Sequence, residues 1–142
     1  MSVHYLEEDR KLTGLNRRIT KNWLHEVIRQ EGKKPGVISY IFCSDEFLVN
    51  INLQYLGKDY FTDVISFDYT ENGVISGDIM ISVDRVRENA EILGISFIEE
   101  LKRIMVHGLL HLIGYEDSTK ELKAVMSGRE DLYLGMARDE GK

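Results

Sequence analysis

The stretch from Ser96 to Asp117 reads SFIEELKRIMVHGLLHLIGYED, and it predicts a long helix that is apolar on most sides. Ser96 is a typical helix N-cap, and Glu99 three residues later completes a capping-box pattern. Gly114 is the residue type that ends a helix, since it adopts the left-handed backbone conformation at low cost. A helix with so broad an apolar surface is expected to be buried, so this stretch decides the fold.

Three potential metal ligands lie in the second half of this stretch. His107 and His111 are four residues apart, so a helix places both imidazoles on one face, within reach of one cation. If the chain turns back after Gly114, the Asp117 carboxylate reaches the same ion, with the spacing H-x-x-x-H-x-x-G-x-x-D. Such a site suits zinc, with iron, nickel or manganese as alternatives, and leaves a position open for water. The alternative is a pair of histidines without a metal, which the glycine stop and the carboxylate disfavour.

One position separates this pattern from that of metalloproteases. The Glu that follows the first His in those enzymes, where it is the general base, is Gly108 here. We expect the small residue to leave space near the metal for a bulky substrate strand. The missing Glu argues against a peptidase.

The composition is typical of one globular domain. The chain has 142 residues, of which 43% are hydrophobic and 30% charged, and we expect residues 1–142 to form a single domain. The formal net charge of −6 provides no general attraction for nucleic acid. We find neither a run near the ~20 apolar residues of a membrane span nor a signal peptide, so we expect a cytoplasmic protein without a membrane partner. The single cysteine, Cys43, is expected to be a packed core thiol, with no disulfide-linked partner.

Periodicity predicts an α+β fold, in which helices pack on a small mixed sheet of about four strands and the metal site lies on a buried helix. The expected strands are residues 3–6, 37–43, 64–69 and 77–83, the last two forming an antiparallel hairpin. Besides the helix from Ser96, the expected helices are 15–30 capped by Thr13, one capped by Ser44 or Asp45 and ended by Gly57, one capped by Asp84, and 118–135. The last helix is expected to pack Leu122, Val125, Met126 and Leu132 or Tyr133.

Three motifs in order resemble those of the YbeY family of bacterial ribosomal-RNA maturation endoribonucleases. Residues 52–67, NLQYLGKDYFTDVISF, are similar to the family segment N-x-x-Y-R-G-K-D-x-P-T-D-V-L-S-F. Residues 77–82, GDIMIS, are similar to G-D-I-x-I-S, and residues 107–117 to H-G-x-L-H-L-x-G-Y-D-H. The resemblance covers most of the chain from about Cys43 onward.

The resemblance implies a zinc-dependent, single-strand-specific endoribonuclease with one zinc per chain. It implies roles in maturing the 3′ end of 16S ribosomal RNA and in ribosome quality control, with ribosomal RNA and the small ribosomal subunit as partners. The metal ligands carry over as His107 and His111, and Asp117 stands where the family has its third His. The added negative charge is expected to make the metal a weaker Lewis acid.

Two departures from the family concern the substrate cleft. The family Arg is Leu56 here, and the family Pro is Phe61. Lys58 is the nearest replacement cation and the candidate for a phosphate contact. Further candidates to line the cleft, which could equally be turn and strand residues, are Thr62, Asp63 and Ser66.

Three functions are compatible with these residues. The first is a metal-dependent ribonuclease, in which the metal polarises a phosphoryl oxygen or supplies hydroxide from bound water. The second is a ribosome-assembly binding factor with a structural zinc, which Leu56 keeps open. The third is a metallohydrolase of another substrate, such as a peptidase, against which Gly108 argues.

Overall fold

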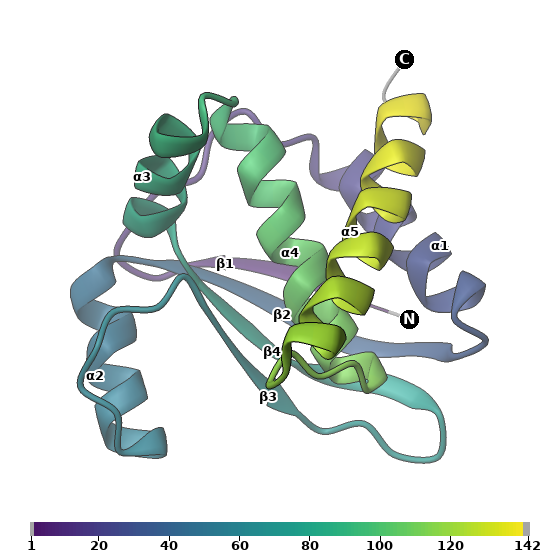
Figure 1. Cartoon of the computed structure of the whole chain (residues 1–142), viewed down its shortest axis with the longest axis horizontal. Helices are drawn as coiled ribbons and strands as arrows, with labels where there is room; N and C mark the ends of the chain where they lie inside the picture. The colour runs from purple at the N-terminus through teal and green to yellow at the C-terminus, as the bar shows by residue number, and fades with distance from the viewer. Residues whose placement is uncertain (1, 141–142) are drawn as a thin grey trace.

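A four-stranded mixed sheet forms the centre of the fold (Figure 1). The computed structural model describes residues 2–140, and its strands are β1 (Ser2–Glu7), β2 (Lys34–Cys43), β3 (Val64–Asp68) and β4 (Val74–Ser82). The strand order is β1-β2-β4-β3, in which β1, β2 and β4 are parallel and β3 is antiparallel to β4. The predicted α+β class, the mixed sheet and the hairpin are confirmed, although β2 and β4 begin earlier than expected.

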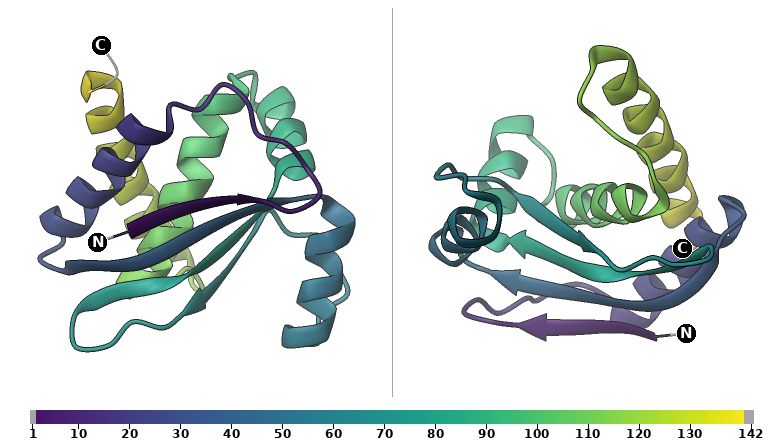
Figure 2. Two further views of the ribbon diagram at one scale, coloured as in Figure 1. Left: turned by 180° about the vertical axis from the view of Figure 1, so that it is seen from behind. Right: turned by 90° about the horizontal axis from the view of Figure 1, so that it is seen from below.

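The helices cover the two faces of this sheet unequally (Figures 1 and 2). One side carries α1 (Arg17–Gln30), α3 (Val83–Leu93), α4 (Phe97–Ile113) and α5 (Lys120–Glu140), and the other carries α2 (Asp45–Leu56). Leu109 of α4 and Ile79 of β4 share the larger core, whereas Leu48 of α2 joins Met80 in a smaller cluster. Because consecutive strand residues point to opposite faces, Ile79 and Met80 mark the two sides.

Two of the predicted helix caps are wrong. Asn16, rather than Thr13, caps α1, and its side-chain oxygen accepts a hydrogen bond from the Ile19 N–H at 3.0 Å. Ser82, rather than Asp84, caps α3. An N-cap must lie just outside the helix, with its oxygen over the N–H three residues on, and Asp84 already lies inside α3, where it pairs with Arg10 instead. Of the two residues predicted as alternative caps of α2, Ser44 is the N-cap, and the predicted Ser96 cap of α4 is confirmed.

The packing of α4 on the sheet corrects the expectation for Gly108. This glycine is buried, and a Cβ built on it would lie 2.7 Å from Ile79 Cγ2 and 3.2 Å from Ser66 Oγ. The missing side chain therefore lets the helix backbone approach the sheet closely, and it does not open space for a substrate strand. A buried close approach of this kind requires glycine for steric reasons.

The last helix buries a stripe that differs in part from the expected one. Met126 and Tyr133 are buried, which settles the choice between Leu132 and Tyr133. Val125 and Leu132 are about half exposed, at 53% and 52%, so the prediction for Val125 is wrong. The Trp23 indole N–H donates to the Tyr133 carbonyl at 2.7 Å and so ties α1 to α5.

Two smaller expectations concern the thiol and membrane spans. Cys43 is a buried free cysteine, as predicted, and burial raises the pKa of its thiol to about 12. Within residues 2–140, none of the helices has the length and apolar character needed to cross a bilayer.

Candidate metal centre

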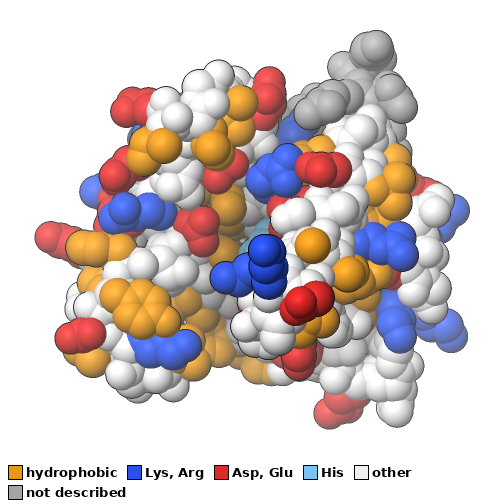
Figure 3. All heavy atoms as spheres, in the orientation of Figure 1, with side chains coloured by type: hydrophobic (Ala, Val, Ile, Leu, Met, Phe, Trp, Pro, Cys, Tyr) orange, Lys and Arg blue, Asp and Glu red, His pale blue; other side chains and the backbone are white. Residues whose placement is uncertain are grey.

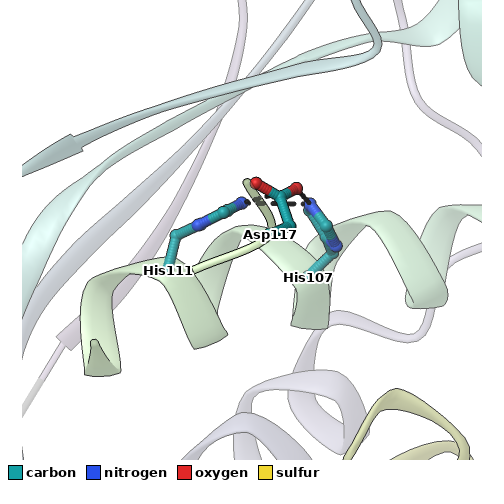
Figure 4. A group of neighbouring side chains, drawn as sticks. All are labelled: His107, His111 and Asp117. Atoms are coloured by element: carbon teal, nitrogen blue, oxygen red, sulfur yellow. Dashed lines mark hydrogen bonds and ion pairs between the residues drawn. The ribbon is translucent and has the colours of Figure 1, made fainter. Parts of the chain in front are cut away.

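His107, His111 and Asp117 converge at the end of α4, as the sequence predicts (Figure 4). The two Nε2 atoms lie 3.1 Å apart, and Asp117 Oδ2 lies 3.5 Å from each of them. Both imidazoles project from one face of α4, and Asp117 approaches them from the segment that follows the helix. Gly114, at φ 121°, ends the helix and lets the chain turn back.

The spacing of these atoms fits a single metal ion. Ligands about 2.0–2.1 Å from a tetrahedral zinc lie roughly 3.3 Å from one another, and the observed separations of 3.1 and 3.5 Å bracket that value. Two nitrogens and one carboxylate oxygen leave a fourth position open, as catalytic zinc sites do. The donor set and the distances therefore suit a catalytic metal.

Each imidazole is held through its second nitrogen. His107 Nδ1 lies 2.6 Å from Glu130 Oε2, and His111 Nδ1 lies 3.1 Å from the Tyr115 carbonyl oxygen. A proton on Nδ1 would be donated to these acceptors, which leaves the lone pair of each Nε2 directed at the metal position. These contacts orient both rings before any ion binds.

Glu130 is a site residue that the sequence reading missed. Its side chain is 8% exposed and accepts a second hydrogen bond from Arg103 Nη1 at 3.0 Å. Burial disfavours the charged imidazolium of His107, but the hydrogen bond and charge of Glu130, together with the charges of Asp117 and Asp63, outweigh burial and raise the pKa of His107. A usable signal was present, because Glu130 lies between Met126 and Tyr133 on the buried stripe of α5, where an acidic side chain needs a partner.

A second cluster holds the segment that carries Tyr115. The Tyr115 hydroxyl donates to Glu31 Oε1 at 2.6 Å, and the Tyr133 hydroxyl donates to the other oxygen of Glu31. Arg129 Nη1 lies 3.7 Å from the same carboxylate. The Glu31 side chain is 9% exposed, so α1 and α5 together fix the segment whose carbonyl orients His111.

A cavity of about 470 Å³ opens beside the three ligands. Its wall includes all four residues that the sequence singled out for substrate contact, namely Lys58, Thr62, Asp63 and Ser66. The two hydroxyls donate to backbone carbonyls, Thr62 to Val64 at 3.3 Å and Ser66 to Gly108 at 3.2 Å. Leu56, at the position of the family Arg, also lines the cavity and is 48% exposed.

Asp63 is the most perturbed acid of the cavity wall. Its carboxylate accepts a hydrogen bond from Asn89 Nδ2 at 3.3 Å. Burial raises the pKa of Asp63, and the nearby His107 lowers it by a smaller amount. A carboxyl group in such a position can hold a proton near the metal ligands.

The chain is similar to known proteins over nearly its whole length. The family model described as Endoribonuclease YbeY matches residues 3–137. The chain is 44% identical over 140 residues to Endoribonuclease YbeY of Parabacteroides distasonis, covering 99% of each chain. It is 52% identical over 113 residues to that of Flavobacterium psychrophilum, covering 80% of this chain and 81% of the relative.

A solved structure shows the same architecture. The solution structure of TM1509 from Thermotoga maritima superposes with a TM-score of 0.68 at 27% sequence identity, covering 98% of this chain and 91% of TM1509. The segment that matches the family model, residues 3–137, contains the whole sheet from Val3 onward, the three metal-ligand candidates and Glu130. Sequence and structure together show that the chain belongs to the Endoribonuclease YbeY family.

Proposed function

We propose that this protein is a metal-dependent endoribonuclease that cleaves single-stranded RNA during maturation of the 3′ end of 16S ribosomal RNA. The observation that carries the proposal is the convergence of His107, His111 and Asp117 beside an open cavity. Membership of the Endoribonuclease YbeY family supports RNA as the substrate. The small ribosomal subunit as partner, a part in ribosome quality control and a cytoplasmic location follow from the family resemblance.

Zinc is the metal that we propose, held by His107 Nε2, His111 Nε2 and a carboxylate oxygen of Asp117. Nitrogen and carboxylate donors in near-tetrahedral spacing, without sulfur, favour a catalytic zinc. Bound there, zinc would supply Lewis-acid chemistry to the phosphodiester. Glu130 and the Tyr115 carbonyl keep the two imidazoles in the orientation that this coordination needs.

The four substrate-contact candidates in the cavity wall have different proposed roles. Lys58 is exposed beside the cavity and is the residue that we propose for a phosphate contact. The Thr62 and Ser66 hydroxyls donate to the backbone, so they shape the wall and offer their lone pairs to the substrate. Asp63, whose pKa is raised by burial, is suited to hold a proton at the wall.

The peptidase alternative loses support from the packing of α4. A metalloprotease needs a Glu after the first metal-binding His, but a side chain at Gly108 would collide with Ile79. The assembly-factor alternative, with a structural zinc, rests on Leu56, which lines the cavity where the family Arg would stand. We also propose that residues 1–142 act as one domain, since one buried cluster includes residues of β1, α1, α4 and α5.

Metal content and RNA cleavage, measured together on the wild type and on His111→Ala, test this function. We expect about one zinc per chain, cleavage of a single-stranded RNA oligomer, and loss of both in His111→Ala. His4→Ala is the matched control, because His4 is exposed on β1, and it should keep metal and activity. Zinc without cleavage would favour the assembly factor, and a metal-free wild type would contradict the metal site.

A further inference from the structure

The mouth of the cavity carries an exposed apolar rim formed by Leu56 and Tyr60. Both residues line the cavity, yet Leu56 is 48% exposed and Tyr60 is 55% exposed. Phe61 continues this surface outside the cavity and is 55% exposed. Figure 3 shows hydrophobic side chains gathered over α2 and the segment after it, beside the cleft in which a histidine is visible.

The rim is held in place by a buried side chain. Asn52 of α2 is 2% exposed, and its Nδ2 donates to the Tyr60 carbonyl at 3.1 Å. The backbone carbonyl of Asn52 accepts a hydrogen bond from the Lys58 backbone N–H at 3.2 Å. Gly57, at φ 67°, ends the helix just before Lys58. Tyr60 is therefore presented on an ordered segment, which lowers the entropic cost of binding a ligand there.

The charge around the cavity does not favour binding through phosphates alone. Of the described residues, Lys58 is the one lysine or arginine in the cavity wall, whereas Asp63, Asp68 and Asp117 all line it. The formal net charge of the chain is −6, so the protein as a whole repels a polyanion. An RNA strand that reaches this site would therefore gain affinity from contacts that do not depend on charge.

An exposed aromatic ring next to a cation supplies such a contact. Lys58 Nζ lies over one face of the Tyr60 ring, 5.9 Å from its centroid, and Tyr60 is 55% exposed, so a base would stack on the other face while Lys58 contacts its neighbouring phosphate. Bases stack on aromatic side chains in proteins that bind single strands. In a duplex the faces of the bases are occupied by their neighbours, so such a ring selects unpaired nucleotides.

We propose that Leu56 and Tyr60 form a subsite that stacks one unpaired nucleobase at the mouth of the cavity, with Lys58 contacting the adjacent phosphate. The inference rests on the proposed ribonuclease function and explains where selectivity for single strands arises. It also gives Leu56 a role: an apolar contact to a base at the position where the family has a cation.

Equilibrium binding of fluorescent RNA in a non-cleaving His111→Ala background tests the subsite. Tyr60→Leu should weaken binding of a single-stranded oligomer by about tenfold or more, and Tyr60→Trp should retain it. Tyr69→Leu is the matched control, because Tyr69 is 60% exposed but outside the cavity wall, and it should leave affinity unchanged. Binding of a duplex of the same sequence should not respond to Tyr60→Leu.

Salt dependence separates stacking from charge. Tyr60→Leu removes no charge, so the slope of log Kd against log salt concentration should stay the same, whereas Lys58→Ala should reduce it by about 0.7. Unchanged affinity of Tyr60→Leu for single strands, as expected if the rim docks a protein instead, would overturn the subsite. So would equal losses for Tyr69→Leu or for the duplex.

Cleavage by the wild type is scored separately from binding. If the wild type cleaves RNA but affinity does not depend on Tyr60, the subsite fails and the ribonuclease function stands. If affinity depends on Tyr60 but no cleavage occurs, the ribonuclease function fails and the base-stacking subsite stands.

Discussion

Gly108 shows how one missing side chain sets the distance between helix and sheet. A Cβ at this position would meet Ile79 Cγ2 at 2.7 Å, and no flexible side-chain end lies there to yield cheaply. We expect Gly108→Ala to lower the free energy of unfolding by about 1–3 kcal/mol, the usual cost of overpacking a core. Urea unfolding followed by circular dichroism measures this change.

The matched control is Gly128→Ala in α5. A Cβ at Gly128 would have no neighbour within 4 Å, so the helix propensity of Ala should stabilise the protein by up to about 1 kcal/mol. Equal effects of the two substitutions would show that Gly108 is not tightly packed against the sheet.

Glu130 is the residue outside the three candidate ligands that we expect to affect metal affinity most directly. Its carboxylate lies 2.6 Å from His107 Nδ1, and a neutral amide there would hold the ring less well. We expect Glu130→Gln to weaken zinc binding by about 10–100-fold, as is usual when the partner of a ligating His is changed. Competition with a chromophoric chelator gives the affinity.

Asp131→Asn is the matched control for Glu130→Gln, because it too removes a carboxylate that binds Arg103. Asp131 Oδ1 lies 3.0 Å from Arg103 Nη2 but is 68% exposed and does not contact His107. The control should retain the zinc affinity of the wild type. A similar loss in both variants would assign the effect to Arg103 instead.

At the scale of elements, α1 and α5 hold the segment between α4 and α5 in place through hydrogen bonds to Glu31. The hydroxyls of Tyr115 and Tyr133 each donate a hydrogen bond to this carboxylate, but only Tyr115 also contacts His111, through its backbone carbonyl. Hydrogen bonds to a charged group contribute about 1.5–3 kcal/mol, so Tyr115→Phe and Tyr133→Phe should destabilise the fold by similar amounts.

Metal affinity should distinguish these two variants. Tyr115→Phe releases the segment that orients His111, and because Tyr115 acts on that ring through its own backbone, we expect zinc affinity to fall by up to about tenfold, at or below the 10–100-fold typical of a direct partner. Tyr133→Phe should leave it near the value of the wild type. Both quantities come from paired thermal unfolding and chelator competition. Equal zinc affinity in the two variants would contradict the proposed link from Glu31 to His111.

At the scale of the whole molecule, the metal would link α4 to the segment that follows it. His107 and His111 belong to α4, Asp117 to the segment after it, and Glu130 brings in α5. A ligand that binds only the folded state adds about 2.7 kcal/mol of stability at a free concentration of 100 times its Kd. Removing the metal with EDTA should therefore lower Tm, and His111→Ala should show little response. An equal response in both would mean that the ion acts elsewhere.

Most of the site could be read from the sequence because its key distances are local. His107 and His111 lie one helical turn apart, and helix geometry alone brings their side chains together. Gly114 ends the helix, and two further residues carry the chain back to Asp117. The helix caps were harder to place, because several residues near each helix start have suitable side chains and only the backbone conformation selects one.

The sequence by itself therefore determined the α+β class, the buried helix α4, the convergence of the three candidate ligands and the family. Only the tertiary structure decided that Glu130, 23 residues from His107, orients its ring, and that Glu31 holds Tyr115 across 84 residues. It also decided that Gly108 faces the sheet rather than the substrate. The physical reason is that these contacts depend on where separate helices and strands meet. That arrangement follows from burying the apolar faces of all elements together, and no local spacing encodes it.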